Sequence, residues 1–128
     1  LFRGTTRTQQ LVEQAKSVFK KWYRWLFGGC VSKYFADAFT SLWNGGMGYD
    51  VIDLINKKPD YDIWITGHSL GGSMASLAAS YILGADFATP QQVKLVTFGQ
   101  PRTGDDEFSA LQESQFCMLK RENVGDTV

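Results

Sequence analysis

The segment Gly67–Gly71 has the sequence G-H-S-L-G, which fits the pattern G-x-S-x-G. In that pattern a serine stands on a tight turn between a strand and a helix, and glycines leave room for the turn. An apolar run precedes the segment and a helical pattern follows it. We therefore predict that Ser69 is a nucleophile whose hydroxyl projects from the turn into solvent. The chemistry that this arrangement serves is acyl transfer.

The G-x-S-x-G segment leads into the predicted helix, so Leu70 lies near the helix start. Amide N–H groups at a helix start lack intrahelical acceptors, and the positive end of the helix dipole favours negative charge. We therefore expect the Leu70 N–H to donate a hydrogen bond to a developing oxyanion. The alternative is a glycine-rich turn in which Ser69 merely caps the helix. His68 is the single histidine of the chain. As the immediate neighbour of Ser69 on a sharp turn it should face another way, so we interpret it as structural.

Two short apolar runs flank the helix that must position this serine. Tyr61–Thr66 and Val93–Phe98 are rich in β-branched and aromatic residues, which is typical of strands buried on both faces. Ser73–Leu83 between them is predicted to be a helix that Gly84 ends. This β-α-β unit favours an α/β fold with a mainly parallel sheet flanked by helices. Further predicted elements are helices at Leu11–Leu26, Phe35–Trp43, Tyr49–Asn56 and Asp105–Gln112, a glycine break at 45–48, a turn at Lys58–Asp60, and strands at Leu1–Arg3 and Phe116–Lys120.

Composition limits the functions that are open to the chain. Its 128 residues are 44% hydrophobic, which suits one domain with a real core. Thirteen basic residues balance 13 acidic ones, so no overall field attracts nucleic acid or an anionic membrane. No apolar run reaches the roughly 18 residues of a transmembrane segment. Cys30 and Cys117 suit free thiols or one long-range bridge, and no Cys/His cluster has metal-ligand spacing.

Three segments together resemble the fungal-type class 3 triacylglycerol lipases of the α/β-hydrolase superfamily. They are L-F-R-G-T at Leu1–Thr5, I-T-G-H-S-L-G-G at Ile65–Gly72 and V-T-F-G-Q-P-R-T-G at Val96–Gly104. The resemblance spans nearly the whole chain. It implies an α/β-hydrolase fold, a lipid or ester substrate met at a lipid–water interface, and a secreted protein. Ser-His-Asp chemistry requires no cofactor or metal.

The resemblance also assigns roles to residues away from the serine. Thr5 would be the second oxyanion donor beside Leu70. Asp126 follows a predicted strand in N-V-G-D-T-V and would be the triad acid, which agrees with the chain order Ser, Asp, His. Asp105 and Asp106 compete for that role, but capping of a helix start explains them. No histidine follows Asp126. We therefore expect the general base to lie beyond the given sequence. Because the sequence begins at Leu1 without a Met and stops at Val128 in a loop-like stretch, we also expect both ends to be truncated and residues 1–128 to be the central part of a single lipase-like domain.

Two further segments bear on the resemblance to the family, one by departing from its pattern and one by its position. Val31–Phe35 reads V-S-K-Y-F, where many relatives have V-H-x-G-F. The family's mobile helical lid would fall within Thr6–Phe27, whose aromatic and basic side chains suit a lipid interface. Core packing explains the same apolar stripe equally well.

The function expected from these observations is hydrolysis of carboxylic esters by a serine esterase, specifically a triacylglycerol lipase. The given residues alone should be inactive because they lack the triad histidine. Two alternatives stay open. One is an esterase or thioesterase for small soluble acyl substrates, and the other is a catalytically silent lipase-like binding protein. The sequence indicates neither a nucleic-acid partner nor an oligomeric state.

Overall fold

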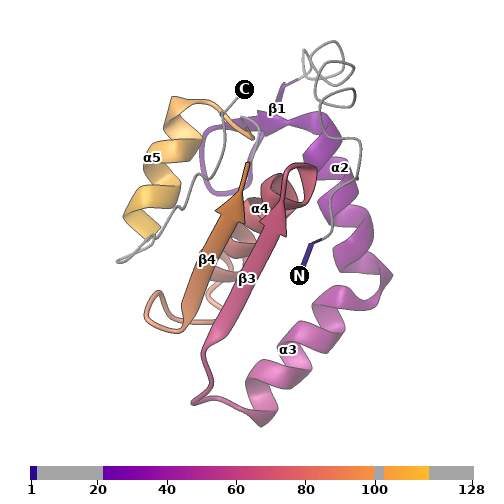
Figure 1. The fold of residues 1–128 in the computed structure, drawn as a ribbon, viewed down its shortest axis with the longest axis vertical. Helices are drawn as coiled ribbons and strands as arrows, with labels where there is room; N and C mark the ends of the chain where they lie inside the picture. The colour runs from indigo at the N-terminus through magenta and orange to yellow at the C-terminus, as the bar shows by residue number, and fades with distance from the viewer. Residues whose placement is uncertain (3–21, 100–102, 116–128) are drawn as a thin grey trace.

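The computed structural model describes residues 1–2, 22–99 and 103–115, with side chains up to Leu111. Its elements, in chain order, are β1 (Trp22–Arg24), β2 (Cys30–Ser32), α2 (Lys33–Leu42), the π-helical turn η1 (Trp43–Met47), α3 (Gly48–Lys57), β3 (Ile63–His68), α4 (Leu70–Gly84), β4 (Val93–Phe98) and α5 (Asp106–Gln115). The arrangement is shown in Figure 1.

The predicted β-α-β unit is present at the centre of the fold. β3 and β4 are parallel, and their register runs from Ile63 opposite Val93 to His68 opposite Phe98. β4 has the predicted bounds, whereas β3 begins two residues later than expected. The reason is that the Tyr61 N–H donates to the Lys58 carbonyl oxygen, which keeps Tyr61 in the preceding turn.

The N-terminal residues extend this sheet on the other side of β3. Phe2 forms a parallel bridge with Gly67, and its N–H donates to the Thr66 carbonyl oxygen at 2.8 Å. The predicted strand at the start of the chain is therefore confirmed at Phe2, while Arg3 lies outside the described residues.

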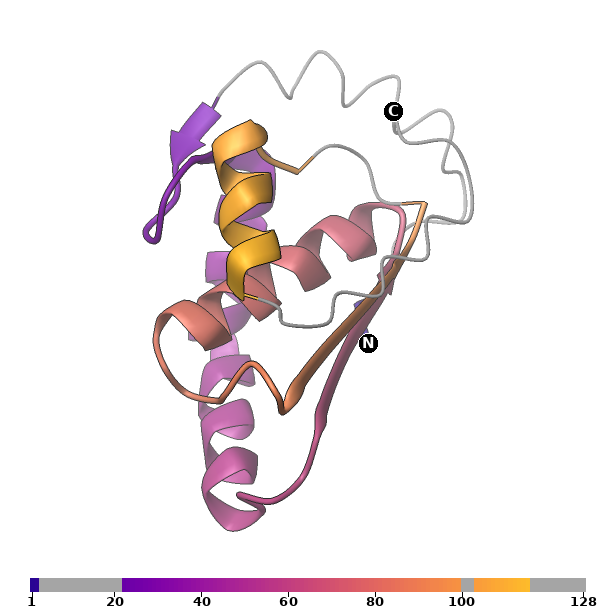
Figure 2. The same ribbon diagram turned by 90° about the vertical axis from the view of Figure 1, so that its left-hand side faces the viewer.

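The described helices lie on one side of the β3–β4 pair (Figure 2). α4 packs directly against both strands and is buried along most of its length. Along β4, Val93, Leu95 and Thr97 are buried while their neighbours are only partly covered. On β3, Ile65 is buried but Trp64 is 66% exposed. The expectation that these strands are buried on both faces is thus wrong for the described part, because its helices cover one face only.

Helices α2 and α3 are joined by a kink at the predicted glycine break. Gly46 has φ 130°, a conformation that favours glycine, within η1. A side chain on Gly48 would collide with the indole of Trp43, so this glycine allows a close contact after the kink. Both helices are confirmed within a few residues of their predicted ends, and none of the described helices has the length and hydropathy of a membrane span.

The predicted amphipathic helix Leu11–Leu26 is wrong over its last part. Trp22–Arg24 is instead the strand β1, which pairs antiparallel with β2. Gly28 and Gly29, with φ 129° and 73°, turn the chain between the two strands. Trp25 is 4% exposed, and its Nε1–H donates to Ser80 Oγ of α4 at 3.0 Å. The predicted helix up to residue 21 lies outside the described residues, as does most of the segment in which a lid was expected.

Candidate active site

Ser69 occupies a sharp turn between β3 and α4, as the sequence pattern predicted. Its backbone has φ 55° and ψ −122°, which is strained for any residue other than glycine. Backbone hydrogen bonds hold the turn, including one at 3.3 Å from the Ser73 N–H to the Ser69 carbonyl oxygen. The Ser69 N–H donates to the Phe98 carbonyl oxygen at 2.8 Å, and the Gly72 N–H donates to the Ser69 carbonyl oxygen at 2.9 Å. The strand, the bend and the helix of a nucleophile elbow are therefore all present.

Gly67 is the residue that lets the strand and the helix approach one another. A Cβ atom at this position would overlap the backbone carbonyl group of Gly71. A steric collision with backbone cannot be relieved by a side-chain rotation, so the first glycine of the G-x-S-x-G pattern is required here. Gly71 and Gly72 are themselves buried in the first turn of α4.

The expectation that the Ser69 hydroxyl projects into solvent is wrong for this structure. Ser69 is 0% exposed, and its Oγ has no hydrogen-bond partner within the described part of the chain. Ser69 lies between the end of β3 and the start of α4, with its N–H bonded to the end of β4, and its short side chain does not reach the surface there. A buried hydroxyl without a partner carries a desolvation cost of about 1–3 kcal/mol, so it is not a stabilising feature.

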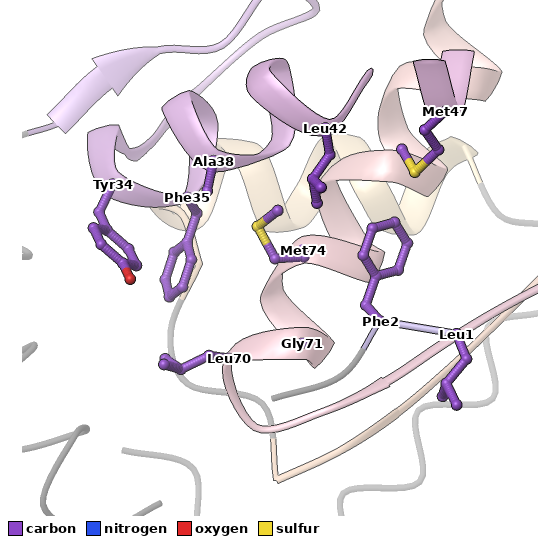
Figure 3. Close-up of a pocket in the computed structure, with 10 residues that line it drawn as sticks. All are labelled: Leu1, Phe2, Tyr34, Phe35, Ala38, Leu42, Met47, Leu70, Gly71 and Met74. Atoms are coloured by element: carbon purple, nitrogen blue, oxygen red, sulfur yellow. The ribbon is translucent and has the colours of Figure 1, made fainter. Parts of the chain in front are cut away.

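The first residues of α4 provide the groups expected for an oxyanion site. Leu70 is the first helical residue, and its N–H cannot bond to a carbonyl within the helix. Leu70 and Gly71 also line a cavity of about 410 Å³ (Figure 3). A space of this size falls within the range of small-molecule binding sites. The helix start thus lies next to a space that a ligand could fill.

The cavity is bounded mainly by apolar side chains from three parts of the chain. They are Leu1 and Phe2 at the N-terminus, Tyr34, Phe35, Ala38, Leu42 and Met47 from α2 and η1, and Leu70, Gly71 and Met74 from α4. The contribution of α2 to the site was not predicted from the sequence. The available signal was the spacing of Phe35, Ala38 and Leu42, which places these residues on one face of a helix.

The acidic residues that compete for the triad role have structural partners. Asp105 Oδ1 accepts hydrogen bonds from the N–H of Cys30 at 3.1 Å and of Phe108 at 2.9 Å. It therefore caps α5 and ties this helix to β2, as the capping interpretation predicted. Asp106 is exposed in the first turn of α5. Thr5 and Asp126, the residues assigned to the oxyanion hole and the triad, lie outside the described residues.

Other reactive side chains are scattered over the described ranges. His68 is exposed at the end of β3, and Cys30 is a free cysteine with partial exposure. In the described ranges, no three His, Cys, Asp or Glu side chains are grouped so that they could hold a metal ion. Ser69 with the amides that follow it is therefore the feature around which chemistry is best organised.

Comparison with known proteins agrees with this geometry. The sequence profile described as lipase (class 3) matches residues 1–128. A lipase of Caenorhabditis elegans is 36% identical over 109 residues, which is 85% of this chain and 30% of the relative. A secreted mono- and diacylglycerol lipase of Fusarium solani is 37% identical over 69 residues, or 54% of this chain and 20% of that protein. The chain thus spans about a third or less of the curated relatives that it matches.

Solved structures show the same fold. One is a triacylglycerol lipase whose catalytic centre is a serine protease triad. It superposes with a TM-score of 0.81 at 28% sequence identity, over 94% of this chain and 45% of that one. The predicted α/β-hydrolase fold is therefore confirmed, and the described elements correspond to part of it.

Proposed function

The chain belongs to the class 3 lipase family, and from this premise we propose that it hydrolyses carboxylic esters through Ser69, with triacylglycerols as its substrates. The observation that supports the proposal most directly is the strained turn at Ser69, with φ 55° between a parallel strand and the start of α4. Such strain persists only where the surrounding structure enforces it, and it is concentrated at functional sites.

The proposed reaction follows the chemistry of serine hydrolases. Ser69 Oγ attacks the ester carbonyl carbon while its proton passes to a histidine base supplied by another part of the polypeptide. The oxyanion accepts hydrogen bonds from the N–H of Leu70 and from Thr5. The alcohol leaves with the proton from the histidine, and water then hydrolyses the acyl-enzyme to release the fatty acid. Asp126 orients the histidine and stabilises its protonated form.

The cavity beside Leu70 is proposed to receive the acyl chain. Its lining is apolar apart from the phenol of Tyr34 and backbone groups, so it suits a hydrocarbon better than a charged or sugar-like ligand. Its volume of about 410 Å³ leaves room for a fatty acyl group beside Leu70, the residue that follows the proposed nucleophile. This feature favours a lipid ester over a small polar ester.

The burial of Ser69 bears on how a substrate reaches its hydroxyl group. Because this serine is 0% exposed, we propose that an opening movement precedes attack and that contact with a lipid surface favours it. A secreted location is also part of the proposal, supported by the similarity to the secreted lipase of Fusarium solani.

A fluorophosphonate probe tests the nucleophile. The complete polypeptide should be labelled at Ser69, and Ser69→Ala should not be labelled. Equal labelling of both proteins would refute the assignment. Rates on emulsified triacylglycerol and on soluble esters separate the lipase from an esterase for small substrates, since only a lipase should accelerate sharply once the substrate forms an interface.

A further inference from the structure

Tyr34 is placed where it can control the shape of the cavity. It is the second residue of α2 and belongs to the stretch V-S-K-Y-F, in which this sequence departs from V-H-x-G-F. Its side chain lines the cavity while remaining 51% exposed. In Figure 3 the rings of Tyr34 and Phe35 extend side by side from α2 at the end of the cavity where Leu70 begins α4.

The opposite end of the cavity is formed by other residues. Leu1, Phe2 and Met47 lie there, away from Tyr34 and Leu70 (Figure 3). Ser69 does not itself line the cavity, but it directly precedes Leu70, so the proposed function places the reacting carbonyl at the end formed by Leu70 and Tyr34. An acyl chain would then extend towards Met47. The two ends of the cavity therefore meet different parts of the same acyl group.

The Tyr34 ring has a rigid support. Its centroid is 5.6 Å from that of Phe35, with an interplanar angle of 74°, an edge-to-face contact. Phe35 is 0% exposed and cannot yield without disturbing the core. The start of α2 is also fixed, because the Ser32 N–H donates to the Thr103 carbonyl oxygen at 2.9 Å. Tyr34 therefore forms one side of the cavity, and its contact with Phe35 holds its ring in place.

From this placement we propose that Tyr34 determines specificity by narrowing the cavity beside the first carbons of the acyl chain. The enzyme then accepts straight acyl groups and discriminates against those branched next to the carbonyl. Met47, at the far end, limits chain length instead. The inference rests on the proposed function, in which the cavity receives the acyl chain.

Three esters with the same leaving group separate these roles: para-nitrophenyl butyrate, isobutyrate and decanoate. In the complete polypeptide, Tyr34→Ala should raise the isobutyrate-to-butyrate ratio of kcat/KM by about tenfold, the effect of one methyl group in an apolar pocket. The decanoate-to-butyrate ratio should change much less. Met47→Ala should show the reverse pattern.

Two further substitutions of Tyr34 keep the test decisive if Tyr34→Ala folds poorly. Tyr34→Phe retains the ring and should keep the parent isobutyrate-to-butyrate ratio. Tyr34→Trp places a larger ring at this side of the cavity and should lower the isobutyrate-to-butyrate ratio. The matched control is Tyr49→Ala, because Tyr49 is likewise the second residue of a helix, is 76% exposed and does not line this cavity. It should leave both ratios unchanged.

The outcomes distinguish this inference from the proposed function. If Ser69→Ala abolishes hydrolysis but the folded Tyr34 variants keep the parent isobutyrate-to-butyrate ratio, the role of Tyr34 is refuted and the nucleophile stands. If Ser69→Ala hydrolyses the esters as fast as the parent, or the parent hydrolyses none of them, the proposed function fails and the inference fails with it.

Discussion

The N–H of Ser69 donates a hydrogen bond to the carbonyl oxygen of Phe98, 2.8 Å away. The bond continues the register of β3 and β4 by one residue beyond the pair His68–Phe98. The position of the candidate nucleophile is therefore set by the sheet. Changes that separate β3 from β4 or from α4 should displace the hydroxyl even when they leave every side chain of the site intact.

Gly67→Ala should lower both stability and activity. The added methyl group would overlap the Gly71 carbonyl group, and forcing the backbones apart should cost about 1–3 kcal/mol of unfolding free energy. Denaturant unfolding and the rate of fluorophosphonate labelling measure the two effects. Gly45→Ala is the matched control, since nothing lies within 4 Å of a Cβ atom there. Equal stability of the two variants would contradict the steric argument.

Ser69→Gly should make the protein more stable while abolishing ester hydrolysis. Ser69 has φ 55°, and a glycine adopts such a conformation without the strain of about 1–3 kcal/mol that other residues carry. Ser69→Ala removes the buried hydroxyl but keeps the Cβ atom. We expect the unfolding free energy of Ser69→Gly to exceed that of Ser69→Ala by about 1 kcal/mol, after the greater flexibility of unfolded glycine is included.

Calorimetry or urea titration of the two inactive variants measures this difference. A Ser69→Gly protein that is less stable than Ser69→Ala would show that the turn is not strained.

Substitution of Asp105 should affect mainly stability, whereas substitution of Asp126 should affect mainly catalysis. Asp105→Ala removes the cap of α5 and the bond to the Cys30 N–H, so it should cost about 1–2 kcal/mol of stability while hydrolysis continues. Under the proposed mechanism, Asp126→Ala should reduce kcat by orders of magnitude, because the proposed triad histidine would lose its orienting acid. Melting temperature and kcat, measured for both variants, form the test. Loss of catalysis in Asp105→Ala at temperatures where it is folded would point to the wrong acid.

The sequence predicted the parts of the fold that depend on local patterns. β4 was predicted with its exact ends, since its apolar run begins after a turn and stops at Gly99. α4 begins at Leu70, earlier than the predicted Ser73, because the small residues Gly71 and Gly72 carry no periodic signal although they are helical. The strand–turn–helix context of Ser69 was correct for the same local reasons.

What the sequence did not predict depends on tertiary contacts. Trp22 fits a helical apolar spacing, yet it lies in β1, because the turn at Gly28–Gly29 and the buried Trp25 place this segment in a hairpin. The burial of Ser69 depends on the tertiary surroundings of the turn and could not be read from its neighbours in sequence. The contribution of α2 to the cavity, including Tyr34, likewise required the packing of α2 against α4.

Removal of two buried hydroxyl groups, those of Thr97 and Ser80, should change the unfolding free energy in opposite directions. Thr97 is 1% exposed on β4, and its Oγ1 has no hydrogen-bond partner among the residues that the structure describes. Thr97→Val keeps the shape of the side chain and removes the unsatisfied group, so it should raise the unfolding free energy by about 1 kcal/mol. Ser80, which is 0% exposed, accepts a hydrogen bond from Trp25 Nε1. Ser80→Ala should therefore lower the unfolding free energy by about 1–3 kcal/mol, because it leaves the indole N–H buried without an acceptor.

Equilibrium unfolding of the two single variants and of the double variant measures both effects. Since the two sites share no hydrogen-bond partner, their effects should add within about 0.5 kcal/mol. A destabilised Thr97→Val protein would show that Oγ1 is satisfied in solution, for instance by a bound water. That result would also weaken the argument that the buried Ser69 hydroxyl costs stability, because neither oxygen has a hydrogen-bond partner in the described structure.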